Sequence, residues 1–393
     1  MQNRSAPRVP SNILTHLTRG WYERVMDDQC TRTRREMLAV GGAAGIGALA
    51  GCLGGENEEV DVNYDEFPDF DPLDPEYPQP AGRLIEEGFA RASIEELEEN
   101  FEPRDEPRYG RAPRDPETAD EIIDPDPLVF AWTPGEEQQV YQEGLDPLIE
   151  NISAETGRDV EVQVIDSYAA MTEAFRSERL HIARVAAGNV PFAVNMTGAV
   201  PFSMPYGDGT FGNRLWIITR IDNDDINTVD DLVGRDVVHT EQTSGSGHLE
   251  PSLFLEEQEG IVPGDDYDIS FSGGHFRSVR GIYLGDYEVG PVAGPIPEVM
   301  DNDDEINAEE LKVVWAGPFA RPLGPMCYQY NLPEEVREGI KRAHFDYDYG
   351  GTDLYEIVNR FDTFAPIDYA THYDPVLQVH EEQGIEYIED NLD

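Results

Sequence analysis

Alternating strand and helix patterns begin at residue 128 and constrain the fold of this chain more than any other feature. Residues 128–132 form a short apolar run that stops at Thr133-Pro134-Gly135, and apolar residues at helical spacing follow as far as Gly157. Further strand patterns, with helical segments between most of them, lie at residues 160–165, 180–185, 215–219, 236–240 and 267–271. Strands that alternate with helices of this length predict βαβ units.

Two successive sets of these units, without a nucleotide-binding glycine fingerprint, predict an α/β protein with two lobes. We expect each lobe to be a mainly parallel sheet flanked by helices, with a ligand cleft between the lobes. Lobe 1 is expected to span 126–214 and to return over 323–393 with the C-terminal helices, and lobe 2 to span 215–322. Ligands of open α/β sheets bind at the carboxyl ends of strands, beside helix N-termini.

The charge of the chain excludes several classes of partner. Among 393 residues there are 80 aspartates and glutamates against 28 lysines and arginines, a formal net charge of -52. Nucleic acids are bound by basic surfaces, so we expect no nucleic-acid partner. A hydrophobic content of 39% argues against a disordered chain. The acidity favours a protein of a halophilic organism, because a Debye length of about 3 Å in molar salt screens like charges. The alternative is an ordinary acidic protein.

The N-terminal region has the features of an export signal. Arg34 and Arg35 form a twin-arginine pair ahead of the uncharged segment 39–50, which is too short for the roughly 20 residues of a spanning helix. The segment leads into Leu49-Ala50-Gly51-Cys52, which resembles a lipobox. We therefore expect residues 1–51 to be a twin-arginine lipoprotein signal. Lipidated Cys52 would then anchor the protein on the outer face of the cytoplasmic membrane.

Residues 52–125 are acidic and rich in proline, with prolines at 68, 72, 75, 78 and 80. Proline favours extended chain and like charges repel one another, so we expect a partly disordered linker. Beyond it, Cys327 is the one cysteine of the body of the chain. This number excludes an internal disulfide, and the spacing of metal-binding cysteines is absent. No metal and no cofactor is expected.

A loop of glycines and hydroxyl residues is the leading candidate for an anion site. Thr243, Ser244, Gly245, Ser246 and Gly247 follow the strand pattern 236–240 and precede a helical segment. Glycine lets backbone amides approach an anion, serine hydroxyls donate hydrogen bonds, and a helix start adds free N–H groups. The loop can also be an ordinary solvent-exposed connection, since glycine–serine loops are common.

Four other residues are candidates for the same site. His275 follows two glycines at the end of the strand pattern 267–271, where it can donate to a ligand or simply cap the next helix. Tyr168 can donate its phenol from the opposite lobe, although half-buried tyrosines are common. Thr133 ends the first strand. Glu288 can accept from a ligand amine or hydroxyl, or be a solvated surface charge.

Several motifs follow one another along the body of the chain. They are Asp166-Ser-Tyr168, the stretch 223–237 with its Asp-Leu-x-Gly, Ser244-Gly-Ser-Gly247, Ser272-Gly-Gly-His275, and the C-terminal segments 332–336 and 364–369. With these motifs in this order, which is more specific than any one of them, residues 128–383 resemble the phosphate, phosphite and phosphonate binding proteins of ABC transporters. The resemblance implies a type II periplasmic-binding fold. It also implies a non-catalytic receptor, expected to be a monomer, that delivers a small oxyanion to a permease and an ATPase subunit.

The chain departs from this family at three positions that bear on the ligand. Gly245 replaces the usual threonine, Phe276 stands where aspartate is common, and Glu288 stands where the family usually has aspartate. Sulfonate, nitrate and a thiamine precursor therefore remain alternative ligands. A sensor or adhesin without a transporter is another alternative. A hydrolytic enzyme that uses His275 is less favoured, because neither a G-x-S-x-G elbow nor a metal-binding cluster appears.

Overall fold

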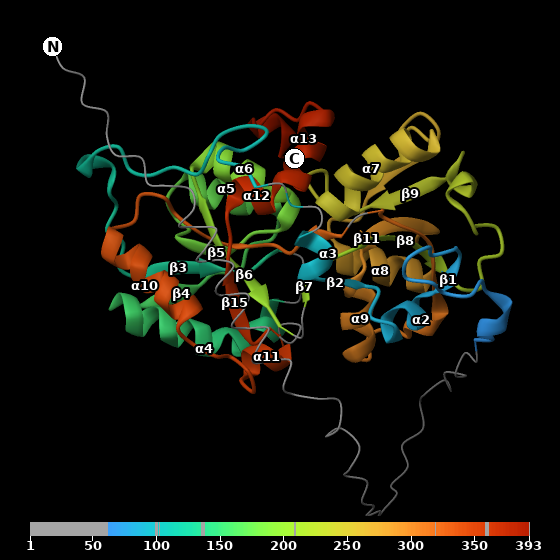
Figure 1. Cartoon of the computed structure of the whole chain (residues 1–393), viewed down its shortest axis with the longest axis horizontal. Helices are drawn as coiled ribbons and strands as arrows, with labels where there is room; N and C mark the ends of the chain where they lie inside the picture. Colours follow the sequence, from blue (N-terminus) through green and yellow to red (C-terminus); the bar gives the residue numbers. More distant parts are fainter. Residues whose placement is uncertain are drawn as a thin grey trace, which may run out of the picture. The chain divides into compact units, whose positions relative to one another are not determined.

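The apolar run that begins at Leu128 forms a strand of the lobe 1 sheet in the computed structural model, between β5 and the edge strand β4 (Figure 1). The structure describes residues 62–98, 101, 103–134, 138–207, 210–318, 320–357 and 361–392. The strand order of this sheet is β15-β6-β14-β5-β3-β4. Its strands are β3 (Leu128–Ala131), β4 (Val160–Val162), β5 (Ile182–Arg184), β6 (Val200–Tyr206), β14 (Met326–Tyr328) and β15 (Thr363–Pro366).

Helices cover both faces of the lobe 1 sheet. Ser167 begins one of them, because its side chain accepts the backbone N–H of Ala170 and so caps the first turn. The apolar side chains of this helix, such as Phe175, then pack into one buried cluster with the sheet and the C-terminal helices. The lobe 1 helices are α4 (Gln138–Thr156), α5 (Tyr168–Arg176), α6 (Val190–Thr197), α10 (Glu334–Phe345), α11 (Asp353–Ile357), α12 (Tyr369–His372) and α13 (Asp374–Glu382).

Lobe 2 is built around a four-stranded sheet in the order β1-β12-β8-β11 and a parallel pair, β10-β9. Strand β11 approaches β9 so closely that a Cβ on Gly290 would lie 2.1 Å from the carbonyl oxygen of Val238. The strands are β1 (Gln79–Pro80), β8 (Leu215–Arg220), β9 (Asp236–His239), β10 (Asp268–Phe271), β11 (Val289–Ala293) and β12 (Leu311–Ala316). The helices are α2 (Ala81–Glu86), α3 (Ile94–Glu98), α7 (Glu250–Phe254), α8 (His275–Leu284) and α9 (Pro295–Asn302).

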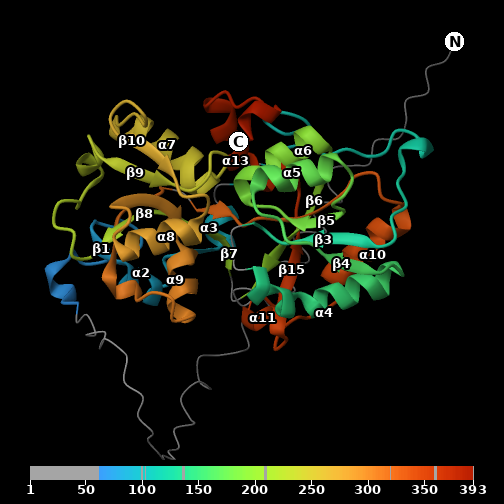
Figure 2. The same cartoon turned by 180° about the vertical axis from the view of Figure 1, so that it is seen from behind.

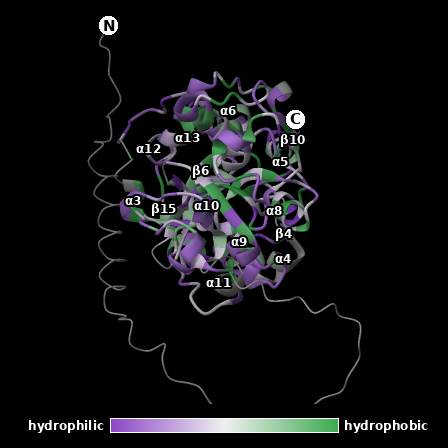
Figure 3. Cartoon of the chain, turned by 90° about the vertical axis from the view of Figure 1, so that its right-hand side faces the viewer, coloured by the Kyte–Doolittle hydropathy of each residue, from purple (hydrophilic) through white to green (hydrophobic). Residues whose placement is uncertain are grey.

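Short helical turns connect these elements. Two are π-helical, η5 (Gly245–Leu249) and η6 (Leu255–Glu259), and lie on either side of α7. The others are η1 (Tyr64–Glu66), η2 (Ala119–Glu121), η3 (Ala187–Asn189), η4 (Val229–Leu232), η7 (Ala308–Glu310) and η8 (Glu389–Asn391). Seen from the side, the inner strands are mostly hydrophobic and the outer helical surfaces largely hydrophilic (Figure 3).

The prediction of two α/β lobes is confirmed, but the prediction of mainly parallel sheets is wrong. Among the described strands, eight of eleven pairings are antiparallel. The parallel pairs are β3-β4, β3-β5 and β9-β10, which belong to the predicted βαβ units. Strand β14, for example, re-enters the lobe 1 sheet after the chain has crossed between the lobes and pairs antiparallel with β5 and β6.

The described part of the predicted linker belongs to the fold, which corrects that prediction. Strand β1 pairs with β12 through Gln79 and Val313, and α2 contributes Ala81 and Leu84 to a buried lobe 2 cluster. Further along, Arg108 pairs with Asp374 of α13 in lobe 1. The proline-rich composition concealed the apolar residues that anchor this segment. The predicted signal and Cys52 lie outside the described residues.

A three-stranded sheet lies between the lobes, in the order β13-β7-β2 (Figures 1 and 2). Strand β7 (Thr210–Asn213) runs from lobe 1 into lobe 2, and β13 (Arg321–Pro322) runs back. Strand β2 (Arg91–Ser93) adds the N-terminal segment to these two. Beyond it, Phe101 packs edge-to-face against His372 of lobe 1 with ring centroids 5.0 Å apart. In the described part of the chain, β7 and β13 thus cross between the lobes, and the N-terminal segment contacts both lobes.

Candidate functional site

The loop from Thr243 to Gly247 lies at the carboxyl end of β9 and opens the helical segment of η5 and α7. Its side chains are buried. The Ser244 hydroxyl accepts the backbone N–H of Gly247 at 3.2 Å and caps the first turn. Gly247 has no room for a side chain, because a Cβ would lie 1.8 Å from Thr240 Oγ1. The predicted anion loop is therefore a tight turn at a helix start, with serine hydroxyls beside its amides.

His275 begins α8 and contacts both serines of this loop. Its Nε2 atom lies 3.3 Å from Ser244 Oγ and 3.4 Å from Ser246 Oγ. Its Nδ1 atom accepts the backbone N–H of Ala293 at 3.2 Å, which leaves Nε2 to carry the proton of a neutral ring. Burial, with a smaller contribution from the charge of Arg321, lowers the pKa of His275 to about 3. The ring is thus a neutral donor aimed at the loop.

Lobe 1 meets this loop through the starts of two helical segments. Asn189 Nδ2 donates to Thr243 Oγ1 at 2.8 Å, so the Thr243 hydroxyl is engaged in the contact between lobes. The backbone N–H of Tyr168, at the start of α5, donates to the carboxyl group of Glu241. Gly188 packs directly on the loop backbone, since a Cβ there would lie 2.4 Å from the amide nitrogen of Gly245. The loop is therefore one of the places where the lobes touch.

Burial raises the pKa of the Glu241 carboxyl to about 7, although the Tyr168 N–H and the Arg277 charge oppose this shift. A carboxyl group at a helix start is stabilised by the free N–H groups there. In the structure this group and the anion loop lie within a few residues of each other along the chain, after the same strand. Glu241 therefore belongs to the interface between the lobes as well as to the surroundings of the site.

Thr133 follows β3 in lobe 1 and is buried, but its hydroxyl is bound within its own lobe. Thr133 Oγ1 donates to the carbonyl oxygen of Arg184 at 3.2 Å and accepts from Arg184 Nη1 at 3.3 Å. The Arg184 guanidinium lies over the Trp132 ring, 5.0 Å from its centroid. Thr133 thus fixes the end of β5 and places a cation at the carboxyl edge of the lobe 1 sheet.

Glu288 lies away from this site, contrary to the prediction. Its carboxylate accepts from Arg235 Nη1 at 3.1 Å, and 60% of its side chain is exposed. Glu288 precedes β11, whereas Ala293, which contacts His275, ends it. The two residues therefore lie at opposite ends of one strand, and the strand direction excludes Glu288 from the loop. The reading of Glu288 as a surface charge fits the structure.

Sequence reasoning missed Asn189, Gly188, Glu241, Glu250 and Arg321. Arg321 Nη1 contacts Glu250 Oε1 at 2.6 Å, and each side chain is 8% exposed. Gly188 and Asn189 follow a strand end, which is the position that favours a ligand site in such sheets. Arg321 gives no such signal, because its partner lies far away in the sequence.

Comparison with known proteins places this chain in a family. Residues 130–373 match the family model for the ABC transporter phosphonate periplasmic substrate-binding protein. The phosphate-import protein PhnD of Mycolicibacterium smegmatis is 28% identical over 205 residues, which cover 49% of this chain and 63% of that protein. The chain thus matches less than two thirds of that relative's length.

Two solved structures share the fold. One is a binding protein component of an ABC phosphonate transporter from Pseudomonas aeruginosa, with a TM-score of 0.60 and 17% identity over 66% of this chain and 87% of that chain. The other is PhnD1 of Prochlorococcus marinus in complex with methylphosphonate, with a TM-score of 0.57 and 16% identity over 66% of this chain and 99% of that chain. From the family match over residues 130–373, the chain belongs to the phosphonate substrate-binding proteins of ABC transporters.

Proposed function

We propose that this protein binds a small tetrahedral oxyanion of the phosphonate, phosphite or phosphate class between its lobes and delivers it to an ABC importer. The observation that carries the proposal is the convergence of His275 Nε2 on the hydroxyls of Ser244 and Ser246, at 3.3 and 3.4 Å, beside two helix starts. The family match and the methylphosphonate held by the P. marinus relative support the same ligand class.

The donors suit an anion that must lose its water. Serine hydroxyls, a neutral histidine N–H and backbone amides replace hydration, and each bond to a charged oxygen contributes about 1.5–3 kcal/mol. Four or five such bonds, less the cost of ordering, are consistent with micromolar affinity, about -8 kcal/mol. The hydroxyls can also accept from a protonated oxygen, which would suit phosphite or a monoprotonated phosphonate.

Calorimetry in multimolar salt tests the proposal, with methylphosphonate, phosphite and phosphate as ligands. We expect one site per chain in the unsubstituted protein. Ser246→Ala and His275→Ala should each weaken binding by roughly tenfold or more, because each removes a donor to a charged oxygen. Thermal unfolding should show that both variants still fold, with a lower midpoint for His275→Ala because the Ala293 N–H loses its acceptor. Unchanged affinity in both variants would place the ligand elsewhere.

The same titrations separate the alternatives. Tighter binding of a sulfonate, nitrate or a thiamine precursor would keep the fold and change the ligand. Release of product from a phosphonate or phosphate ester would indicate an enzyme. Oxyanion binding by a protein whose gene has no neighbouring genes for a permease and an ATPase would favour a sensor.

We also propose export by the twin-arginine route and lipid anchoring at Cys52, with the permease and ATPase subunits as partners. The motif around Arg34 and Arg35 and the lipobox ending at Cys52 support this proposal. None of the helices among the described residues is long and apolar enough to cross a membrane. Mass spectrometry of the mature N-terminus should find a lipid on Cys52, and Cys52→Ser should release the protein from membranes. An unmodified Cys52 in a membrane fraction would contradict the anchor.

A further inference from the structure

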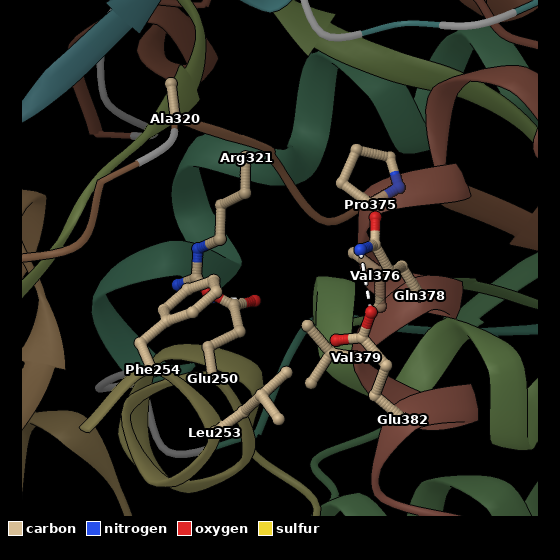
Figure 4. Close-up of a pocket in the computed structure, with 10 residues that line it drawn as sticks. All are labelled: Glu250, Leu253, Phe254, Ala320, Arg321, Pro375, Val376, Gln378, Val379 and Glu382. Carbon is tan, nitrogen blue, oxygen red and sulfur yellow. Dashed lines mark hydrogen bonds and ion pairs between the residues drawn. The ribbon is translucent and has the colours of Figure 1, made fainter. Parts of the chain in front are cut away.

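A buried ion pair lies beside the anion loop and joins the sheet between the lobes to α7. Arg321 extends from β13, and Glu250 is the first residue of α7. Figure 4 shows the two side chains approaching each other at one side of a cavity of about 160 Å³ between α7 and α13. At 2.6 Å and 8% exposure for each side chain, this is a tight contact removed from solvent.

The guanidinium of Arg321 connects three parts of the molecule. Arg321 Nε donates to Asn213 Oδ1 at 2.9 Å, so one side chain joins β13 to β7, the two strands that run between the lobes in opposite directions. Through Glu250 the same guanidinium reaches α7, which follows the anion loop. The ion pair thus fixes the helix start of lobe 2 to the crossing strands.

Both charges of the pair border the loop itself. A Cβ built on Gly245 would lie 2.9 Å from Glu250 Oε1 and 3.0 Å from Arg321 Nη1. Arg321 also acts on His275, since its charge adds to the effect of burial in lowering the pKa of that ring. The carboxylate and the guanidinium are therefore close enough to influence any anion held by Ser244, Ser246 and His275.

We propose that Arg321 is a positioning residue of the oxyanion site, which acts by pairing with Glu250 and so keeps an uncompensated carboxylate from facing the anion loop. The inference rests on the proposed function, because it assigns the electrostatic balance of the same site. A buried carboxylate beside the loop would repel an oxyanion and would compete for the same amides. In a chain with a net charge of -52, Arg321 supplies the local cation that cancels this repulsion.

The size of the effect follows from Coulomb's law. For an assumed separation of about 7 Å between the unit charge and a bound monoanion, and an effective dielectric constant of about 20, the affinity changes by roughly 50-fold. The sign depends on which partner is removed. Loss of Arg321 leaves the negative charge of Glu250, and loss of Glu250 leaves the positive charge of Arg321.

Titration of Arg321→Gln, Glu250→Gln and the double variant with methylphosphonate and with phosphate tests the inference. We expect Arg321→Gln to weaken binding 10- to 100-fold, Glu250→Gln to strengthen it several-fold, and the double variant to bind within about tenfold of the parent protein. A pair with a purely structural role would make both single variants weaker alike, and that result would overturn the inference. Failure of the parent protein to bind either anion would instead refute the proposed function.

Unfolding measurements without ligand separate affinity from folding. Breaking a buried pair from one side destabilises the fold, because the remaining charge is left buried and unpaired, so Arg321→Gln can fail to fold. In that case Glu250→Gln decides, since a loss of affinity in this variant would equally overturn the inference. The matched control is Asp374→Asn, which breaks the pair between Arg108 and Asp374 in lobe 1. This control should lower stability and leave the affinity unchanged.

Discussion

Closure of the lobes can be tested with one methyl group at Gly188. Gly188 lies in η3 of lobe 1, and its neighbours in the other lobe are backbone atoms of the anion loop. A Cβ would lie 2.4 Å from the Gly245 nitrogen, 2.8 Å from its Cα and 3.0 Å from the Thr243 carbonyl oxygen. Backbone atoms cannot move aside as a flexible side chain does. Gly188→Ala should therefore oppose closure and leave each lobe intact.

The expected magnitude has two parts of opposite sign. Overpacking of a tight contact costs about 1–3 kcal/mol, and here the cost falls on the closed state alone. Since about 1.4 kcal/mol is a factor of ten, oxyanion affinity should fall by roughly 5- to 150-fold. The φ angle of Gly188 is not in the left-handed region, so alanine is compatible with its backbone. In the open state alanine should raise the free energy of unfolding by about 0.4–1 kcal/mol, because it lowers the conformational entropy of the unfolded chain.

Two measurements on the same preparation check this reasoning. Calorimetry with methylphosphonate gives the affinity, and urea unfolding without ligand gives the stability. Gly350→Ala is the control, because Gly350 is exposed and the nearest atom to its Cβ would be a carboxylate oxygen of Asp348 at 3.0 Å. If Gly188→Ala binds as tightly as the control variant, the contact between Gly188 and Gly245 is not needed for ligand binding and the reasoning fails.

Two further predictions concern stability. Burial raises the pKa of Glu241 to about 7 from its ordinary value of 4.5, so the folded protein holds this proton more tightly than the unfolded chain. The contribution of Glu241 to stability should therefore fall as pH rises from about 4.5 to 7, by on the order of 3 kcal/mol. The buried histidines titrate alike in both proteins, so urea titrations at several pH values should show this change in the difference in unfolding free energy between the parent protein and Glu241→Gln. Leu84→Ala should cost about 2–5 kcal/mol of unfolding free energy, because Leu84 is fully buried in the lobe 2 cluster. A cost near zero would mean that the N-terminal segment is dispensable.

The positions of the strands and of the loop followed from local patterns. Residues 128–131 and 236–239 are runs that strand propensity and apolar content indicate directly, and Gly-Gly before His275 marks a turn into a helix. The position of a loop between a strand and a helix is encoded by neighbouring residues. For this reason the sequence alone predicts that the anion loop and His275 belong to one site.

Other features depend on partners that are distant in the sequence. The direction of β14 is set by the crossing of the chain between lobes, which no local pattern records. The pairing of β1 with β12 joins residues more than two hundred positions apart, so the local, proline-rich composition of this segment predicts only a linker. Glu288 was misplaced for a similar reason, since only the direction of β11 shows that it lies at the far end from the loop.

The strand that the N-terminal segment adds between the lobes has a mechanical consequence. Two connecting strands form a ribbon that can both bend and twist, whereas β2, bonded to β7 beside β13, widens this ribbon to three strands. A three-stranded ribbon is harder to twist about its long axis than to bend. The lobes should consequently swing about one axis and keep the faces at Gly188 and Gly245 in register at every stage of the swing. The N-terminal segment that contributes β2 should thus restrict how the two lobes rotate relative to each other.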